Sequence, residues 1–257
     1  MTDHDDVLLT EQRDHTLLIT INRPEARNAL NGAVARAMAA ALDRLDEDDD
    51  LRVAVLTGAG GTFSSGMDLK GFLTGDLPLV EGRGLAGLTE APPRKPLIAA
   101  IEGYALAGGC ELVLACDLVV AAEDAKLGVP EVKRGLVAAG GAAMLLAQRI
   151  PRAAALELLL VGDPVGAQRA YELGLVNQVV PSGTAVEAAL ALAARISANG
   201  PLAVAVTKEV ALSAADWSFE EGWAKQSELI NPVFVSADAQ EGAIAFAEKR
   251  PPVWTGR

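Results

Sequence analysis

The chain has 257 residues, of which 51% are hydrophobic and 22% are charged, and this balance is typical of a globular protein and excludes bulk disorder. Its formal net charge of −12 argues against a nucleic-acid-binding protein, which presents a basic face, and against a polybasic membrane anchor. The N-terminus is acidic and polar, no apolar run reaches the length of a membrane span, and the two cysteines, Cys110 and Cys116, lie in an apolar stretch. We therefore expect a soluble cytoplasmic protein with free thiols and with neither a nucleic acid nor a membrane as partner.

Strand and helix patterns alternate through the first two thirds of the chain. Asn28 is the expected N-cap of a first helix, because apolar residues recur at helical spacing from Ala29 to about Leu45. Runs of β-branched and apolar residues predict strands at 7–10, 16–22, 52–57, 97–102, 117–121 and 176–180. Further helices are expected at 108–115, 140–149, 153–160 and 167–173. This alternation predicts an α/β layered fold.

From Thr184 onward the pattern is helical only. Four segments carry helical spacing, at 185–198, 201–213, 219–230 and 237–249, and a Pro-Pro pair follows the last. We expect a helical appendage whose Ala- and Leu-rich surface requires a partner surface.

The residues that are absent narrow the chemistry. Only two histidines occur, His4 in an expected frayed tail and His15 in an expected surface turn, so a histidine-activated nucleophile is disfavoured. The sequence contains no GxSxG elbow, no phosphate-binding P-loop, no GxGxxG after a strand and no Cys/His cluster with zinc spacing. A Ser-His-Asp hydrolase, ATP hydrolysis and NAD-dependent redox chemistry are therefore disfavoured.

Two glycine-containing loops each follow a strand and open a helix, Phe63–Lys70 and Gly103–Glu111. Backbone N–H groups at the start of a helix lack internal acceptors and point at anions. Two such ends from neighbouring strands place two donors on one oxygen, which is the arrangement of an oxyanion hole. The alternative is that the glycines only permit tight packing.

Two glutamates stand in apolar surroundings. Glu111 lies one turn into an apolar helix, and Glu131 follows Pro130 in an apolar segment. A carboxylate in such a place is paired, capping or catalytic, because burying it alone is costly. Two carboxyl groups that face one cavity have separated pKa values and run acid and base steps without histidine. The alternatives are a salt bridge from Glu131 to Lys133 or Arg134 and a capping role for Glu111.

Several separated segments, in order, match one known family. They are 22–30 (NRPEARNAL), 63–70, 103–112, the pair Pro130-Glu131, and 241–250. In these segments the sequence resembles the crotonase, or enoyl-CoA hydratase/isomerase, superfamily from about Val7 to Trp254, and particularly its bacterial enoyl-CoA hydratases. The resemblance implies a spiral of ββα units that carries the CoA and active sites (1–195), followed by a helical trimerisation region (196–257). It also implies a homotrimer or a hexamer formed as a dimer of trimers.

The resemblance further implies an acyl-CoA thioester substrate and assigns roles to residues. The thioester carbonyl would be held by the main-chain N–H groups of Met67 and Gly108. Glu131 would deliver a proton to the α carbon, and Glu111 would help to activate the attacking water. Since related isomerases tend to lose the position of Glu111, hydration of a trans-2-enoyl-CoA is the first expectation, with no metal and no cofactor apart from the CoA of the substrate.

By the same resemblance, CoA contacts are expected from two parts of the chain. One set lies near the first segments, and the other is on the C-terminal helix of the same or a neighbouring subunit. These residues are Ala26, Arg27, Ser65, Asp68, Leu69 and Lys70, then Phe246 and Lys249. For the two lysines the alternative is a solvated surface charge.

One departure from the family pattern concerns the segment after Glu131. Ala138-Ala139 stands where many hydratases have Pro-Gly, and Gly140-Gly141 follows. Two other functions therefore stay open: another crotonase reaction, such as isomerisation or a carnitinyl-CoA-type dehydration, and a catalytically weak acyl-CoA-binding protein.

Overall fold

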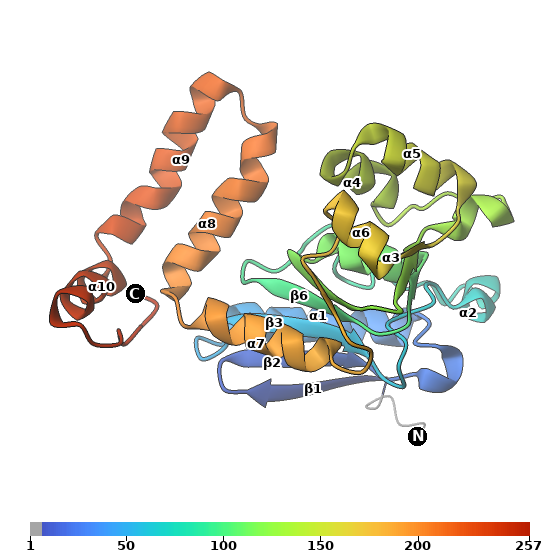
Figure 1. The fold of residues 1–257 in the computed structure, drawn as a ribbon, viewed down its shortest axis with the longest axis horizontal. Coiled ribbons are helices and arrows are strands. Elements are labelled where there is room, and N and C mark those ends of the chain that lie inside the picture. The colour runs from blue at the N-terminus through green and yellow to red at the C-terminus, as the bar shows by residue number, and fades with distance from the viewer. Residues whose placement is uncertain (1–6) are drawn as a thin grey trace.

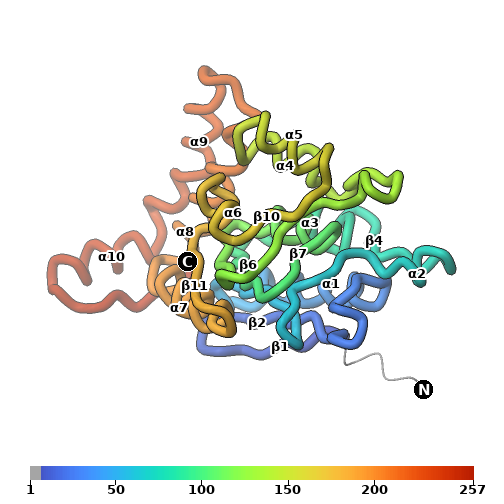
Figure 2. Tube along the Cα trace, turned by 45° about the vertical axis from the view of Figure 1, so that its right-hand side comes forward, coloured from blue at the N-terminus to red at the C-terminus, as the bar shows by residue number. Residues whose placement is uncertain are grey.

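The computed structural model describes residues 7–257 (Figure 1). Residues 1–6, which include His4 of the expected frayed tail, lie outside the described residues. The body of the molecule is built on a six-stranded sheet, and C-terminal helices extend away from this body in both views (Figures 1 and 2).

The central sheet joins one hairpin to a row of parallel strands. Its order is β1-β2-β3-β6-β8-β11, in which only β1 and β2 pair antiparallel. The inner strands β3 and β6 are buried along nearly their whole length, which explains their continuous apolar sequences. The strands are β1 (Leu8–Arg13), β2 (Thr16–Ile21), β3 (Val53–Gly58), β6 (Leu97–Ile101), β8 (Leu118–Ala122) and β11 (Gln178–Val180).

Short strands form a second sheet that the sequence patterns did not predict. Its order is β10-β9-β7, and a separate pair, β4 and β5, lies apart from it. These strands are β4 (Leu79–Val80), β5 (Gly84–Leu85), β7 (Tyr104–Leu106), β9 (Lys126–Gly128) and β10 (Val165–Gly166). The chain thus runs strand, strand, helix twice, through β6, β7 and α3 and then through β8, β9 and α4. This order confirms the expected α/β class and its ββα units.

Helices pack on both faces of the central sheet. Side chains of α1 and α3 join β2, β3 and β6 in the larger of two buried apolar clusters. The helices of the body are α1 (Gly32–Glu47), α2 (Leu69–Thr74), α3 (Gly108–Ala115), α4 (Ala142–Arg149), α5 (Arg152–Val161), α6 (Ala167–Leu173) and α7 (Ala185–Ser197), with 3-10 turns at Pro24–Ala26 and Pro130–Arg134.

Helix α7 belongs to the body, although the sequence placed the start of the appendage at Thr184. Its Ala185, Ala189 and Ala193 are fully buried against Val53 and Ile98 of the sheet in the second apolar cluster. An alanine every fourth residue lets a helix approach a sheet closely. The same spacing is compatible with an interface to another chain, so the sequence alone did not distinguish the two.

The remaining helices form an arm that stands away from the body in Figure 1. They are α8 (Pro201–Ser213), α9 (Phe219–Phe234) and α10 (Ala237–Glu248), with a 3-10 turn at Ala214–Asp216. No single helix among the described residues is long and apolar enough to cross a membrane. Residues 185–197 and 201–216 reach that length only together, and the chain bends by 106° between them.

The predicted N-cap of α1 is wrong. The cap is Asn31, whose side chain accepts a hydrogen bond from the Val34 N–H at 3.0 Å. Asn28 is instead fully buried with a φ of 54°, and its amide donates to the carbonyl oxygens of Ala59 and Thr62. The helix starts later than expected because Leu30 is first used in a backbone bridge to Met67.

Candidate active site

Backbone bridges hold the two glycine-containing loops against each other. Leu30 pairs with Met67, and Ser64 pairs with Ala105, both in parallel. In the second bridge the Ser64 N–H donates to the Tyr104 carbonyl and the Leu106 N–H donates to the Ser64 carbonyl, each at 2.9 Å. The loops that follow β3 and β6 are therefore fixed side by side.

The N–H groups of Met67 and Gly108, which meet at this junction, have no acceptor within residues 7–257. The bridge beside Met67 uses the Leu30 N–H, bonded to the Gly66 carbonyl, and the Asp68 N–H, bonded to the Leu30 carbonyl, and it leaves the Met67 N–H unused. Gly108 is the first residue of α3, so its N–H has no partner inside the helix. These are the two donors predicted from the sequence for an oxyanion hole.

The glycines make the close approach of the loops possible. A methyl group on Gly66 would lie 2.9 Å from the Gly108 nitrogen, and one on Gly109 would lie 2.4 Å from the Ser64 carbonyl oxygen. The packing role that stood as the alternative is therefore real. The same close packing brings Gly66, which precedes Met67, against Gly108. The packing role is therefore compatible with the expected placement of the Met67 and Gly108 N–H groups.

Glu111 is buried on α3 and caps the next helix. Only 3% of the residue is exposed, and its Oε1 accepts a hydrogen bond from the Ala142 N–H at the start of α4, at 3.2 Å. Burial raises the pKa of this carboxyl and the charge of Glu131 raises it further, while hydrogen bonds from the N–H groups of Ala142 and Gly140 oppose the rise in pKa. The capping role that stood as an alternative is confirmed.

Glu131 stands on the 3-10 turn after β9 and keeps one oxygen free. Its Oε2 is buried and has no hydrogen-bond partner among the described residues. Burial raises the pKa of this carboxyl, against the smaller effects of its own N–H and of Arg134. The alternative salt bridge is wrong for Lys133, which pairs with Asp163, and no oxygen of Glu131 lies within ion-pair distance of Arg134.

The charges of Glu111 and Glu131 influence the same buried groups around the start of α3. Besides the effect of Glu131 on Glu111, both charges raise the pKa of the Cys110 thiol, which burial already drives up and which reaches about 12. A methyl group on Gly140 would lie 2.6 Å from Oε2 of Glu111. The glycine-rich segment before α4 thus lies directly against one of the two carboxylates.

Most of the residues expected to contact CoA gather beside these loops. The Ser65 N–H donates to the Arg27 carbonyl at 3.0 Å, which joins the segment that contains Ala26 to the segment that ends in Leu69 and Lys70. The carboxylate of Asp68 is occupied locally: it pairs with Arg23 at 3.0 Å and accepts hydrogen bonds from the N–H groups of Lys70 and Gly71 at the start of α2.

Two expected CoA contacts lie elsewhere. Phe246 is on α10 and Lys249 is its C-cap, and α10 lies at the opposite end of the molecule from α2 in both views (Figures 1 and 2). Phe246 is 87% exposed. Within one chain these two residues do not join the other six.

Two residues that organise the site have roles that the sequence does not signal. Arg23 ties Asp68, and with it the start of α2, to the segment before α1. Ala107, just before Gly108, has a φ of 52°. Arg23 lay within a recognised segment, but neither residue type carries a pattern that signals these roles.

A family model described as enoyl-CoA hydratase/isomerase matches residues 11–257 of the chain. The chain belongs to the enoyl-CoA hydratase/isomerase family. A crystal structure of an enoyl-CoA hydratase from Mycobacterium tuberculosis is similar to this family member with a TM-score of 0.97 and 59% identity, over 98% of this chain and 100% of that one.

Two curated relatives extend the comparison. An enoyl-CoA hydratase of Mycobacterium tuberculosis is 44% identical to this family member, over 97% of this chain and 96% of that protein. A carnitinyl-CoA dehydratase of Proteus mirabilis is 39% identical, over 95% of this chain and 97% of that protein.

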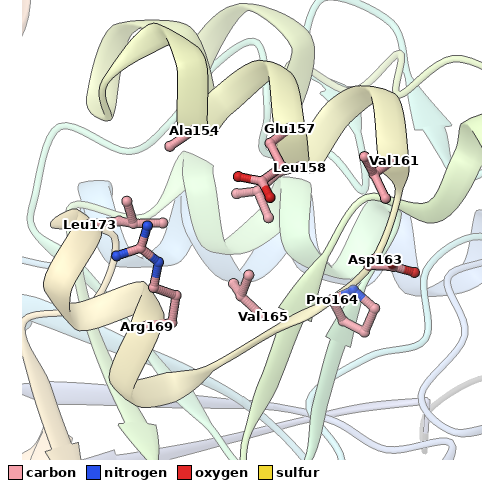
Figure 3. A pocket seen from close by; sticks show the side chains of 9 residues that line it. All are labelled: Ala154, Glu157, Leu158, Val161, Asp163, Pro164, Val165, Arg169 and Leu173. Atoms are coloured by element: carbon pink, nitrogen blue, oxygen red, sulfur yellow. The ribbon is translucent and has the colours of Figure 1, made fainter.

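This family member also has a pocket of about 200 Å³ between α5 and α6 (Figure 3). The carboxylate of Glu157 and the guanidinium of Arg169 face its interior. Arg169 also pairs with Glu172 at 3.4 Å. None of the residues expected in the active site lines this pocket, so the two sites are separate.

Proposed function

We propose that the protein is an enoyl-CoA hydratase, which adds water syn across the trans-2 double bond of an enoyl-CoA thioester to give 3-hydroxyacyl-CoA. The observation that carries the proposal is the pair Glu111 and Glu131. Both carboxyl groups have raised pKa values, and the charge of Glu131 contributes to the rise for Glu111. Two unpaired amides at the junction of neighbouring loops, those of Met67 and Gly108, complete the set.

In the proposed reaction the thioester oxygen accepts hydrogen bonds from the N–H groups of Met67 and Gly108. This polarises the conjugated system, so the β carbon becomes electrophilic and the developing enolate oxygen is stabilised. Glu111 takes a proton from water as the water oxygen bonds to the β carbon. Glu131 gives a proton to the α carbon, and the enolate becomes a thioester again. At the end of the reaction Glu131 has lost a proton and Glu111 has gained one. Proton exchange with solvent restores the starting state of both carboxyl groups.

This mechanism uses no metal or redox cofactor, since the amides polarise the carbonyl and the glutamates move the protons. Coenzyme A enters as part of the substrate and contacts Ala26, Arg27, Ser65 and 68–70 in the proposal. The protein acts in a reducing compartment, the cytoplasm, where buried Cys110 and Cys116 stay thiols.

The first experiment follows the loss of the conjugated enoyl-thioester absorbance with short, medium, long and branched 2-enoyl-CoA substrates. We expect hydration with an optimum at one chain length. Glu131→Gln should lower kcat by at least about 10²-fold, which is the lower end of the usual general acid–base contribution, while CoA binding is kept.

Glu157→Gln is the matched control, because Glu157 is an exposed glutamate that lines the separate pocket. It should leave kcat unchanged. Full turnover by Glu131→Gln would overturn the assignment of Glu131, and the absence of hydration with every substrate would overturn the reaction.

Dehydration of carnitinyl-CoA is the second candidate, and the 39% identity to a carnitinyl-CoA dehydratase favours it. The same two carboxylates serve it, because dehydration is hydration in reverse. Product analysis by NMR with carnitinyl-CoA and with enoyl-CoA separates the two activities. A catalytically weak acyl-CoA-binding protein would instead bind acyl-CoA of every length tested and turn over none.

We further propose that the protein assembles as a homotrimer or as a hexamer of two trimers through residues 196–257. Large apolar side chains on the arm support this, since the exposed fractions are 83% for Phe219, 62% for Trp223 and 74% for Phe234. In such an assembly Phe246 and Lys249 reach the CoA of a neighbouring subunit. Light scattering at micromolar concentration tests the assembly, and a monomer would contradict it.

A further inference from the structure

The residue before Gly108 has a backbone conformation that glycine adopts and other residues avoid. Ala107 has a φ of 52° and a ψ of −128°. These angles resemble those of the first central residue of a type II′ turn, where glycine is preferred because a Cβ collides with the neighbouring carbonyl. Strained backbone of this kind persists only where the surrounding structure enforces it.

Hydrogen bonds on both sides of Ala107 enforce the conformation. Its N–H donates to the Gly128 carbonyl at the end of β9, at 2.9 Å. Its carbonyl accepts from the N–H of Cys110 at 2.8 Å and from that of Glu111 at 3.1 Å, in the first turn of α3. One residue thus connects the second sheet to the helix that carries Glu111.

The conformation of Ala107 fixes the direction of the Gly108 N–H. A trans peptide places its carbonyl and its N–H on opposite sides. Because the Ala107 carbonyl points into α3, the Gly108 N–H points out of the helix start. The ψ of Ala107 therefore sets the aim of this donor.

The methyl group of Ala107 separates the two loops. A Cβ on Gly66 would lie 2.7 Å from the Cβ of Ala107, so the Ala107 methyl lies over the Gly66 backbone. Gly66 immediately precedes Met67. This contact therefore helps to set the distance between the N–H groups of Met67 and Gly108.

We propose that Ala107 is a positioning residue for the oxyanion hole: its strained backbone and its methyl group hold the Gly108 N–H at a fixed direction and distance from the Met67 N–H. This inference rests on the proposed function of those two amides. The Ala107→Gly variant relieves the backbone strain, so its melting temperature should equal or exceed that of the wild type. The Gly108 N–H should at the same time become more mobile. We expect kcat to fall about tenfold, less than the loss of one donor, with KM changed less than kcat.

The test compares Ala107→Gly with Ala107→Ser and Asp14→Gly. Serine keeps a Cβ and should recover most of the loss. Asp14 is another non-glycine residue at positive φ, 50°, in the exposed turn between β1 and β2. Its replacement relieves similar strain away from the site and should leave kcat unchanged.

Infrared spectra of a bound saturated acyl-CoA, labelled with ¹³C at the thioester carbonyl, separate this inference from the proposed function. Binding to the wild type should lower the carbonyl stretching frequency, and Ala107→Gly should show a smaller lowering. No lowering in the wild type would overturn the oxyanion hole itself. A lowering in the wild type that Ala107→Gly retains, with unchanged kcat, would overturn the role of Ala107 alone, and so would a fall in the melting temperature of Ala107→Gly.

Discussion

Glu111 and Glu131 differ in the hydrogen bonds that their carboxylates receive. The N–H groups of Ala142 and Gly140 stabilise the ionised form of Glu111, whereas Oε2 of Glu131 has no partner among the described residues. Hydrogen bonds to the charged form lower a pKa, and burial without them raises it. In the proposed reaction, the hydrogen bonds to Glu111 stabilise the carboxylate that accepts a proton, and the raised pKa of Glu131 favours the protonated form that donates one.

Replacing Glu131 by Gln should change the pH dependence of stability. The pKa of Glu131 is raised in the folded state, so stability falls as pH rises from the ordinary carboxyl pKa through the raised one. Gln does not titrate, so Glu131→Gln should gain stability over the wild type at neutral pH and lose that gain below the ordinary pKa. Urea unfolding at both pH values measures this, with Glu157→Gln as control. A difference that is the same at both pH values would contradict it.

Replacing Gly140 by Ala should displace Glu111. The added methyl would lie 2.6 Å from Oε2 of Glu111 and 2.7 Å from Cδ2 of Leu85, so the carboxylate must move. We expect kcat to fall by about ten- to a hundredfold, because small misplacements of a catalytic group are costly. Steady-state kinetics check this. Gly222→Ala is the control, since its methyl would meet nothing closer than 3.8 Å, and wild-type kcat in Gly140→Ala would refute the displacement.

At the scale of elements, Lys208 of α8 makes an ion pair and hydrogen bonds to the body of the molecule. Nζ of Lys208 pairs with Asp117 at 2.7 Å and donates to the carbonyl oxygens of Pro93 and Lys95 at 2.8 and 3.1 Å. Both charged side chains are largely shielded, with exposed fractions of 11% and 18%. These hydrogen bonds therefore join α8 to the body in a contact that is partly shielded from water.

Lys208→Met should lower the free energy of unfolding by about 1–3 kcal/mol, because it leaves shielded acceptors without a donor. Urea unfolding measures the change. Lys225→Met is the matched control, since Lys225 makes an exposed i,i+4 pair with Glu221, and such pairs contribute only about 0.3–0.5 kcal/mol. Equal effects of the two substitutions would contradict a specific role for Lys208.

The strands and helices that carry their own pattern were predictable from the sequence, and those defined by distant pairing were not. The run 52–57 predicted β3 to within one residue, since buried parallel strands are continuously apolar. The three-residue strands β7 and β9 exist because Tyr104 pairs with Lys126 and its neighbours follow. No local pattern marks such short strands.

In the candidate site, too, some features could be predicted from the sequence and others could not. Glu111 and Glu131 could be selected as candidates because a carboxylate in an apolar segment is conspicuous, and the family resemblance gave them their expected roles. The conformation of Ala107 was not predictable, because alanine carries no signal for positive φ. Phe246 and Lys249 lie away from the other residues in one chain, so a single sequence does not place them.

At the scale of the whole molecule, the C-terminal tail fastens α10 and joins it to the body. Glu241 accepts two hydrogen bonds from Arg250, at 2.6 and 2.9 Å, and one from the Val253 N–H at 2.7 Å. Nε1 of Trp254 then donates to the Ala198 carbonyl, at the end of α7, at 2.8 Å. The arm is therefore attached both at α8 and through the tail.

Glu241→Gln should loosen this tail in a pH-dependent way. Hydrogen bonds from Arg250 hold the pKa of Glu241 at about 2. A lowered pKa contributes stability above the ordinary carboxyl pKa, and that contribution is lost as pH falls towards about 2. At neutral pH the variant should release residues 250–257 to proteases faster than the wild type, as mass spectrometry can follow. The melting temperatures of the two proteins should converge in acid, and a constant gap would contradict this.

Helix α3 carries both thiols of the chain, Cys110 next to Glu111 and Cys116 at its C-terminal cap. Both are buried, and burial raises the pKa of each, that of Cys110 to about 12. Alkylating reagents and oxidants attack the thiolate, so they reach these sulfurs only after the helix has opened. The rate of their modification therefore measures the breathing of the segment that bears Gly108 and Glu111. The protein thus contains a native reporter of the opening of α3, and the same burial protects that helix from oxidative damage.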